Sequence, residues 1–523
     1  MRRMRWFPSL RSLSLLAAMT SCAEPTVESP PPPMPLSWQK SLPATDSLHW
    51  QQAARGLRGV RGIIHLHSVF SHDACDGKPQ PNGTANAPCL DNLRRGLCAT
   101  RQDFAMLTDH ATLMADSAFS DLFLTDVALG DAAERATADP DPQVDVVGSR
   151  LRCADDTAPG HRVHIAVGGE NELMPVGLRR HLGADPASRH AAMQAATPDA
   201  VRAFHAAGGV VLVAHGESHP LEQLSTLAQA GLDGMEVYNL HANIDPKIRG
   251  PYLGLDPLGA ITGLVPWLGG RSVSDGGPEP DLALLGFLSP NQSQLDKFDT
   301  LLAAGHHLTP TLGSDIHENT LKEPLADGER GDGYRRLMRW FGNYLLIPTG
   351  TAISTEVLRQ ALLSGRAFGV FELFGPPEGF DFHALYSSGS PSGSRTAELG
   401  DQAPLGARLR VALPRPFPAA LRGAEPLLRL SLRYVPLRDK SPPTTLLRSE
   451  EVLARTLSAD EFAAESRAES TPVLEFDTAG RGPGAYRVEI HIVPRHLLHL
   501  LGDMPDAFRR EYPYLYSAPV WVR

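Results

Sequence analysis

Histidines and carboxylates follow five short apolar runs in this 523-residue chain. The side chains that follow these runs are His65 and His67, Asp109 and His110, Glu170, His215, and Asp315 with His317. Imidazole and carboxylate together suit Zn, Mn or Fe, whereas calcium prefers oxygen ligands alone. One histidine after a strand is a weak sign of a site, but five such placements predict a metal centre.

His65 and His67 have the spacing that places two side chains on the same side of a strand. Asp315 and His317 share this spacing. In parallel α/β barrels the active site gathers at the carboxyl ends of the strands, so residues far apart in sequence meet at one mouth. The pattern therefore predicts that these side chains converge on one site.

The elements that position these residues lie in residues 47–375, where short apolar runs alternate with helix-like segments. Thr197 and Pro198 are typical of an N-cap followed by a first-turn proline, which predicts a helix over 198–207. The same pattern predicts helices over 221–230, 293–304 and 355–364. The long stretches 113–160 and 241–300 indicate insertions, which we expect to reshape access to the site.

Residues 376–523 have a different texture. Alternating apolar and polar residues predict strands at 407–413, 428–435 and 486–493, separated by Pro, Gly and Ser. This pattern is typical of antiparallel strands in a β-sandwich. One segment, 450–465, is predicted to be helical.

The motifs resemble those of the PHP (polymerase and histidinol phosphatase) superfamily over roughly residues 60–320. The matching motifs are His65-Leu66-His67-Ser68, Ser71-His72-Asp73, Thr108-Asp109-His110, Glu170, and Gly313-Ser314-Asp315-Ile316-His317. The resemblance implies an α/β fold, a distorted (β/α)7 PHP barrel, followed here by a C-terminal antiparallel β-sandwich-like domain. It also implies two or three divalent metal ions and hydrolysis of phosphate mono- or diesters.

The resemblance also implies a role for each ligand. The first metal would bind His65, His67 and Asp315, and Glu170 would bridge it to the second metal. The second metal would also bind His181 and His215, with His219 as an alternative to His215. The third metal would bind Asp73, His110 and His317.

Two further residues are catalytic candidates. Asp109 would orient a ligand or move a proton, and structural support is its alternative role. Arg366 would fork onto a phosphate, as would Arg179 and Arg180, unless they are solvated surface arginines. Glu236 ends another strand-like run, where it would line the mouth or accept backbone hydrogen bonds.

The N-terminus predicts export. Arginines precede the short apolar run 13–19, which is followed by Thr-Ser-Cys22. This segment, 1–22, resembles a bacterial lipoprotein signal, with ordinary cleavage as the alternative, and residues 23–46 read as a Pro-rich linker. We therefore expect a periplasmic or outer-membrane lipoprotein that touches the membrane only through a lipid at Cys22.

Four other cysteines, Cys75, Cys89, Cys98 and Cys153, bear on the same question. In an exported chain they predict two disulfides, with three possible connectivities. Cysteine-ligated zinc is the alternative.

The function expected from sequence is that of an exported metal-dependent phosphoesterase that uses metal-activated water. Its partner would be a small phosphorylated substrate or a nucleotide, whereas the formal net charge of −10 argues against a stable nucleic-acid complex. Two alternatives remain open: a cell-surface binding protein without turnover, and a metal-dependent hydrolase of a non-phosphate bond.

Overall fold

The computed structural model describes residues 38–124, 133–136, 148–154, 158–387, 393–415, 425–438, 443, 445–457, 461, 472–503 and 506–523. All of them belong to one compact unit, Pro35–Arg523. The predicted signal 1–22, with Cys22, lies outside the described residues, as does the linker up to residue 37. No helix of the described residues is long and apolar enough to cross a membrane.

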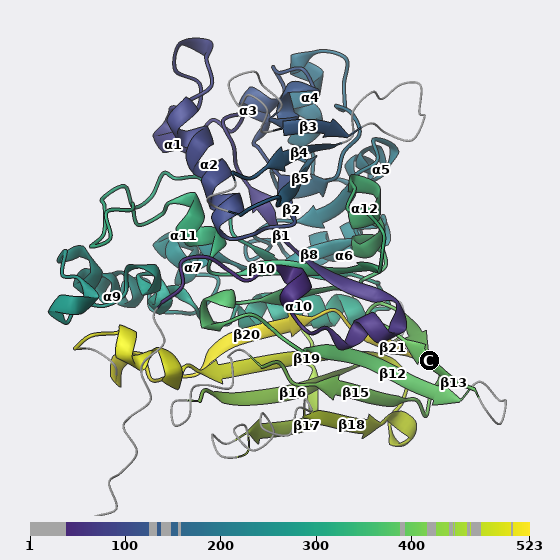
Figure 1. Cartoon of the computed structure of the whole chain (residues 1–523). Helices are drawn as coiled ribbons and strands as arrows, with labels where there is room; N and C mark the ends of the chain where they lie inside the picture. Colours follow the sequence, from purple (N-terminus) through teal and green to yellow (C-terminus); the bar gives the residue numbers. More distant parts are fainter. Residues whose placement is uncertain are drawn as a thin grey trace, which may run out of the picture. The chain divides into compact units, whose positions relative to one another are not determined.

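Six parallel strands carry the polar residues singled out above. They are β1 (Leu57–Leu66), β2 (Phe104–Leu107) and β5 (Arg162–Val167) in one sheet, and β7 (Val210–Val213), β8 (Gly234–Asn239) and β9 (Thr309–Gly313) in another. Their residues are almost all buried, as expected for strands covered on both faces. The predicted mixed α/β architecture is therefore confirmed (Figure 1).

The two sheets share a core and touch at one end. An isolated parallel bridge joins Leu66, at the end of β1, to Ile316 after β9. Apolar side chains from β1, β2, β5 and β7 pack with β6 (Leu173–Val176), which runs antiparallel to β7. Hydrogen bonding is thus divided between two sheets in the described part of the chain, rather than running around a single parallel barrel wall.

Helices cover these strands where the sequence predicted them. The four predicted helices are α5 (Pro198–Ala206), α6 (Leu221–Gln229), α10 (Gln292–Ala303) and α12 (Thr355–Leu363). The Thr197 hydroxyl accepts a hydrogen bond from Ala200 N at 3.2 Å, which confirms the predicted N-cap. The remaining helices are α1 (Ala74–Gly77), α2 (Ala87–Ala99), α3 (Ala111–Met114), α4 (Pro186–Met193), α7 (Leu240–Ile244), α8 (Pro246–Arg249), α9 (Gly259–Leu268) and α11 (Tyr334–Met338).

The C-terminal strands pair antiparallel, as predicted, except that Gln402–Ala403 pairs parallel with Val520–Val522. One sheet contains β12 (Asp381–Ser387), β13 (Ser394–Ala397), β15 (Arg408–Ala412) and β18 (Val473–Asp477). The other strands, β14 (Gln402–Ala403), β16 (Leu427–Pro436), β17 (Glu450–Leu457), β19 (Gly484–Val493), β20 (Tyr512–Ser517) and β21 (Val520–Val522), belong to the thirteen-stranded sheet that holds β1. That sheet also contains an antiparallel pair, β3 (Ala133–Ala136) and β4 (Gly148–Arg152).

The large sheet is continuous from β1 to the C-terminal strands. β10 (Gly342–Pro348) pairs antiparallel with β1, β11 (Ala367–Val370) pairs with β10, and β20 pairs with β11. The domain boundary predicted at residue 375 therefore falls between strands of one sheet, and the division into two domains stays a prediction.

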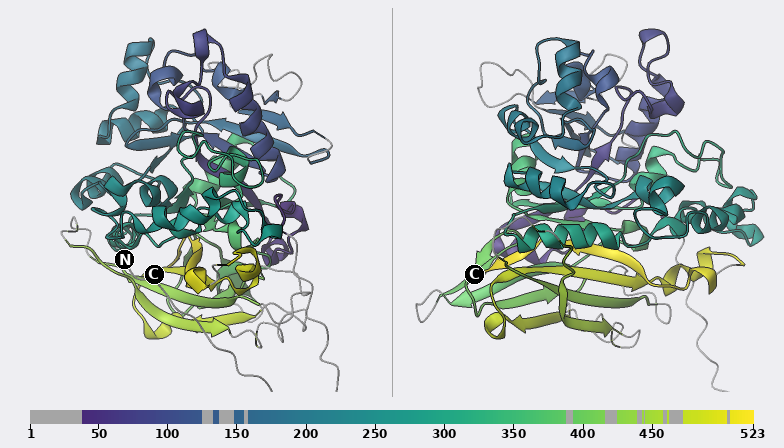
Figure 2. Two further views of the ribbon diagram at one scale, coloured as in Figure 1. Left: turned by 90° about the vertical axis from the view of Figure 1, so that its left-hand side faces the viewer. Right: turned by 180° about the vertical axis from the view of Figure 1, so that it is seen from behind.

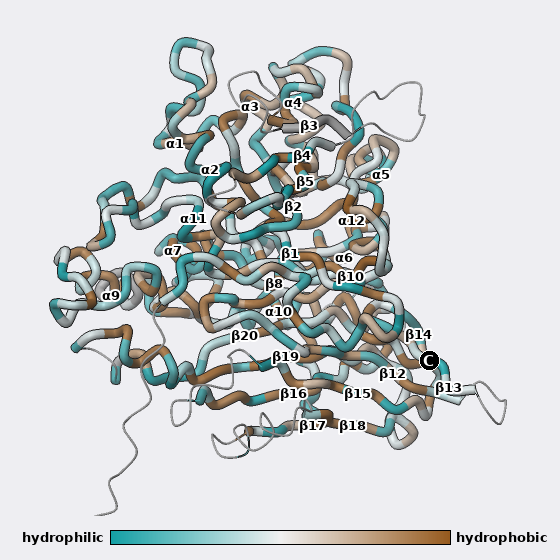
Figure 3. The backbone as a smooth tube through the Cα atoms, viewed as in Figure 1, coloured by the Kyte–Doolittle hydropathy of each residue, from teal (hydrophilic) through white to brown (hydrophobic). Residues whose placement is uncertain are grey.

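Helix α10 lies between the first sheets and the C-terminal strands, as Figure 2 shows. Its buried Asp299 pairs with the buried Arg487 of β19, with Arg487 Nε 2.7 Å from Asp299 Oδ1. Figure 3 shows hydrophobic stretches along the strands on either side.

The helix predicted over 450–465 is wrong in its first half. Residues 450–457 form β17, which pairs antiparallel with β16, so that Leu453 lies opposite Leu432 and Leu457 opposite Leu428. The local sequence is rich in residues that favour helices, but strand pairing overrides propensity. Residues 458–460 and 462–465 lie outside the described residues.

Candidate metal centre

Every one of the six parallel strands delivers a histidine or a carboxylate at or just beyond its carboxyl end. In strand order these are His65 and His67, His110, Glu170, His215, His241, and Asp315 with His317. Because parallel strands end at the same side of a sheet, the side chains converge. His241 is new: it lies at the start of α7, two residues after β8, and the sequence reasoning had passed over it.

The innermost group, which we call the metal cluster, consists of His65, His67, Glu170 and Asp315. All four side chains are buried, and one ligand atom from each lies within 4.8 Å of the others. His67 Nε2 is 3.1 Å from Glu170 Oε2 and 3.3 Å from Asp315 Oδ1. His65 Nε2 is 3.3 Å from Glu170 Oε2 and 3.2 Å from Asp315 Oδ1.

Three potential ligand atoms of this cluster are buried without hydrogen bonds, as expected if they bind a cation. His65 Nε2, His67 Nε2 and Glu170 Oε2 are buried, and none makes a hydrogen bond to any described residue. Unpaired buried polar atoms are costly, so such a group calls for an explanation. A divalent ion bound by two imidazoles and two carboxylates would satisfy all three atoms at once.

A second group shares His67 and adds Asp73, His110 and His317. Asp73 Oδ2 lies 3.3 Å from His110 Nε2 and 3.0 Å from His317 Nε2. The structure thus brings together the residues predicted for the third metal.

The predicted second-metal residues divide. His215 Nε2 contacts Glu170 Oε1, as predicted, whereas His181 Nε2 lies 3.0 Å from the carbonyl oxygen of Ser117, away from both groups. His241 occupies the open side instead, with Nδ1 3.1 Å from Asp315 Oδ2. His219, the alternative to His215, contacts Gln223 and no residue of the metal cluster.

Glu236 fixes His65 from behind. Its Oε1 accepts a hydrogen bond from His65 Nδ1 at 2.6 Å, and its Oε2 accepts one from His215 N at 2.8 Å. The bond to Nδ1 leaves the lone pair of Nε2 facing the metal cluster. A side chain at Gly313 would collide with this carboxylate, since its Cβ would lie 2.0 Å from Glu236 Oε1. Glu236 thus orients a ligand, beyond the two roles considered from sequence.

Asp109 and Ser71 support the neighbouring ligands. Asp109 is buried and accepts hydrogen bonds from the backbone and the hydroxyl of Ser68, beside His67. Burial raises the pKa of Asp109, although His67 and the Ser68 bonds lower it. The Ser71 hydroxyl lies 3.0 Å from His67 Nδ1 and donates to Asp73 Oδ1 at 2.7 Å. Both residues hold the loop that carries the ligands.

Three ligands adopt left-handed backbone conformations that residues other than glycine rarely adopt. Their φ angles are 80° at His65, 25° at His215 and 51° at Asp315. Such conformations are costly and cluster at functional sites, where surrounding structure enforces them. Their coincidence at one centre supports a functional role.

The charges of the metal cluster are strongly coupled. Burial alone would lower the pKa of His67, but the neighbouring carboxylates of Asp315 and Glu170 raise it to about 10. Burial would raise the pKa of Glu170, but His65 and His215 hold it well below its ordinary value. The carboxylates therefore remain ionised, as metal ligation requires.

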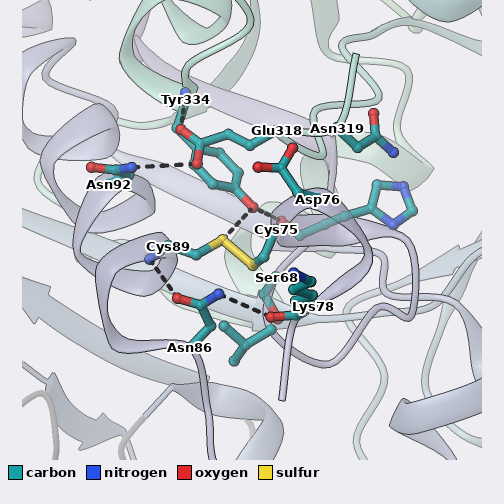
Figure 4. Close-up of a disulfide and its surroundings, with 12 residues drawn as sticks. Ser68, Cys75, Asp76, Lys78, Asn86, Cys89, Asn92, Glu318, Asn319 and Tyr334 are labelled. Atoms are coloured by element: carbon teal, nitrogen blue, oxygen red, sulfur yellow. Dashed lines mark hydrogen bonds between the residues drawn. A yellow bond between two sulfur atoms is a disulfide. The ribbon is translucent and has the colours of Figure 1, made fainter. Parts of the chain in front are cut away.

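A disulfide stands beside the Asp73 group. Cys75 pairs with Cys89, and Cys98 with Cys153, which selects one connectivity and replaces the cysteine-zinc alternative. Figure 4 shows Cys75–Cys89 next to Asp76, Glu318 and Tyr334. Cys75 N donates to the carbonyl oxygen of His317 at 2.9 Å, so the bridge ties the Asp73 loop to the strand-end segment that carries His317.

The predicted phosphate-binding arginines do not reach the site. Arg366 lies 3.5 Å from Asp401, and Arg179 pairs with Glu356 at 2.8 Å. Arg180 donates to the carbonyl oxygen of Ala206. Arg366 directly precedes β11, which runs in the same direction as β1 because both pair antiparallel with β10. Arg366 therefore lies toward the amino ends of the parallel strands, away from the site.

The candidate metal ligands open onto a cavity of about 690 Å³. Asp73, His110, His215 and His241 are among the side chains that line it. Residues from the predicted insertion 241–300 line much of the rest, consistent with the expectation that this insertion reshapes access.

Comparisons with known proteins give little guidance. No family model matches the chain, and no curated protein matches it. Among solved structures, PsfC from Pseudomonas syringae PB-5123 is similar at 12% identity and a TM-score of 0.31, over 60% of this chain and 91% of that one. A likeness this low carries no argument about fold or activity.

Proposed function

We propose that this protein is a metal-dependent phosphoesterase whose residues 47–375 form a distorted (β/α)7 barrel of the PHP type. One observation carries the proposal: two groups of histidines and carboxylates share His67 at the strand ends, with three buried ligand atoms that lack hydrogen bonds. A structural ion-pair network would satisfy those atoms within the protein.

The residues suit two or three divalent ions of Zn, Mn or Fe. The metal cluster would hold one, and Asp73, His110 and His317 another. A further ion, on the side of the cavity, would be held by His215 and His241 together with Glu170 and Asp315. Bound there, the ions would lower the pKa of water and neutralise charge on phosphate oxygens.

The protein's own contribution is positioning. Glu236 and Ser71 fix the rings of His65 and His67, and Asp109 fixes the loop after His67. The left-handed backbone at His65, His215 and Asp315 aims their side chains at one point. A substrate phosphoryl group would enter from the cavity, since His110 and His215 face it.

Export is a further part of the proposal. The N-terminal segment 1–22 resembles a lipoprotein signal, and a lipid at Cys22 would tether the chain to a periplasmic or outer-membrane surface. The two disulfides, Cys75–Cys89 and Cys98–Cys153, suit an oxidising compartment.

A hydrolase of a neutral ester is the second candidate. It is favoured by the cavity, because none of the described residues that line it is a lysine or an arginine. A binding protein without turnover is disfavoured, because the ligand set is intact apart from His181.

The test is hydrolysis by the purified chain loaded with Mn or Zn. An aryl phosphate monoester, the matching diester and a neutral aryl ester are compared, with the double variant His65→Ala/His67→Ala as background. Hydrolysis of either phosphate ester, measured by release of the aryl alcohol, that vanishes in the double variant supports the proposal. Turnover of the neutral ester alone would support the second candidate, and no turnover in metal-loaded protein would contradict both.

A further inference from the structure

The cavity in front of the candidate metal ligands is lined by two kinds of side chain. Asp73, His110, His215 and His241 are polar. The apolar side chains, which we call the apolar wall, are Leu240, Ile244, Leu264, Leu284, Phe287 and Leu337. The cavity volume of about 690 Å³ is far larger than one phosphoryl group requires and falls in the range of sites for whole organic molecules.

Two cations from the segments around the apolar wall, Arg249 and Lys297, are engaged elsewhere. Arg249 donates to the carbonyl oxygens of Asn243 and Asp256. Lys297 donates to three backbone carbonyl oxygens, those of Gly216, Glu217 and His219. Neither is among the described residues that line the cavity.

The charged side chains that line the cavity, apart from the candidate metal ligands, are acidic. They are Asp245, Glu318 and Asp332, and Asp332 is already paired with Arg330, whose Nε lies 2.6 Å from Asp332 Oδ1. A nucleoside di- or triphosphate, or a sugar phosphate with further anionic groups, would therefore meet no unpaired side-chain cation among the described lining residues. The cavity is therefore suited to a substrate with one phosphoryl group.

The apolar wall comes largely from the insertion at 241–300. Helix α7 supplies Leu240 and Ile244, and α9 supplies Leu264. The wall is only partly closed, since Ile244 and Leu264 are half-buried and the next residue, Val265, is 62% exposed. Figure 3 shows hydrophobic stretches around α9. Side chains that stay partly exposed beside a cavity gain burial when an apolar group enters.

We propose that the substrate is a phosphate ester with an apolar leaving group, an alkyl or aryl alcohol, which lies against Ile244, Leu264 and Phe287 while the phosphoryl group meets the metal ligands. This inference rests on the proposed phosphoesterase function. It narrows the substrate class by excluding nucleoside di- and triphosphates, which the sequence alone had left open.

The test uses the purified, metal-loaded chain and a series of n-alkyl phosphates with two to twelve carbons. KM is expected to fall about threefold per added methylene until the apolar wall is covered. A nucleoside 5′-triphosphate is expected to be hydrolysed at least 100-fold less efficiently than the best alkyl ester. Equal efficiency for the nucleotide and the octyl ester would overturn the inference.

Matched variants locate the apolar contact. Leu264→Asp is expected to abolish the chain-length gain, whereas Val265→Asp, on the same helix but outside the cavity, is expected to retain it. Ile244→Ala, a milder change, is expected to raise the KM for octyl phosphate about fivefold. This variant replaces Leu264→Asp in the test if Leu264→Asp fails to fold. A chain-length gain that survives both cavity variants would overturn the inference.

Binding of n-alkyl phosphonates, measured by calorimetry, separates this inference from the proposed function. Affinity that rises with chain length without turnover of any phosphate ester would keep the apolar site and overturn the phosphoesterase. Turnover of phosphate esters without any dependence on chain length would keep the phosphoesterase and overturn the apolar site.

Discussion

Two groups of ionisable side chains in this protein lie close enough to hold a cation, and they differ in character. The metal cluster of His65, His67, Glu170 and Asp315 leaves three buried atoms without hydrogen bonds. A second group, Asp281, Asp327 and Glu329, brings three carboxylates within 4.8 Å of one another, and only Asp281 is buried. We call this second group the arginine cluster.

The arginine cluster satisfies its carboxylates from within the protein. Arg335 and Arg336 lie 2.6 and 2.5 Å from Asp281 Oδ1, and Trp38 Nε1 donates to Asp281 Oδ2 at 2.8 Å. Asp327 pairs with Lys40 at 2.9 Å. Proximity of carboxylates is therefore not enough to indicate a metal: the distinguishing features are unsatisfied ligand atoms, histidine partners and an adjoining cavity.

The largest expected effect is at Glu170. Glu170→Gln is expected to lower kcat for phosphate ester hydrolysis by at least about 10³-fold, because this carboxylate contacts His65, His67, His110 and His215. Metal content, measured by mass spectrometry after dialysis, is expected to fall with it. Glu172→Gln is the matched control. Unchanged kcat and metal content in Glu170→Gln, or equal losses in both variants, would contradict the assignment of Glu170 as a metal ligand.

The arginine cluster is expected to respond in stability alone. Asp281→Asn removes the buried negative charge that Arg335 and Arg336 share, although Arg336 keeps Asp327, and is expected to lower the free energy of unfolding by about 3–5 kcal/mol. Denaturant unfolding measures this loss, and metal content is expected to stay unchanged. Glu329→Gln, at an exposed carboxylate, is expected to change stability by less than about 1 kcal/mol. Loss of bound metal on Asp281→Asn would contradict the assignment.

The two disulfides differ in whether they lie beside a candidate metal ligand, so removing each one separates an effect on stability from an effect on metal binding. Removing Cys75–Cys89, which has a sequence separation of 14, as Cys75→Ser/Cys89→Ser is expected to cost about 3 kcal/mol of stability. Removing this disulfide is also expected to lower the affinity for the metal ion at Asp73, because Cys75 is hydrogen bonded to His317. Removing Cys98–Cys153 is the control: it should lower stability without affecting metal affinity, and equal effects on metal would refute the link.

Variants at His241 and His181 test which histidine joins His215, Glu170 and Asp315 in holding the second metal ion. His241→Ala is expected to lower the affinity for one metal ion by about 10- to 100-fold, because the His241 ring contacts Asp315. His181→Ala is expected to leave all metal affinities unchanged, because its ring bonds to Ser117. Metal titration followed by calorimetry distinguishes the two, and the reverse pattern would restore the sequence-based assignment.

The smallest expected effect is a pH dependence beside the arginine cluster. Burial, together with the charges of Asp281 and Asp327, raises the pKa of Glu279 to about 7. The folded state therefore holds a proton that the unfolded state releases near pH 4.5, so stability falls as pH rises from there through 7. The loss is expected to be about 1–2 kcal/mol and to disappear in Glu279→Gln. A variant whose stability keeps the same slope in urea unfolding at pH 5 and 8 would refute this origin.

Sequence reasoning succeeded where a residue's position followed from the end of a strand. His65, His110, Glu170, His215 and Asp315 converge because parallel strands end together. His181 lies apart because it follows β6, which runs antiparallel to β7. Its place in the assignment rested on a motif rather than on strand geometry.

The rest required tertiary information. His241 could have been noticed as a histidine two residues beyond the buried strand 234–239, but it lies on a helix, where strand alternation gives no signal. Segment 450–457 favours a helix locally and becomes a strand because β16 pairs with it. The orphaned atoms and the arginine partners of Asp281 depend on contacts across more than 50 residues, which spacing cannot reveal.

The most direct test is anomalous X-ray diffraction from crystals of the chain grown with Mn²⁺. The account predicts a strong anomalous peak among His65 Nε2, His67 Nε2, Glu170 and Asp315, a second one beside Asp73, and none at Asp281. A peak at the arginine cluster, or none at the metal cluster at saturating Mn²⁺, would contradict it.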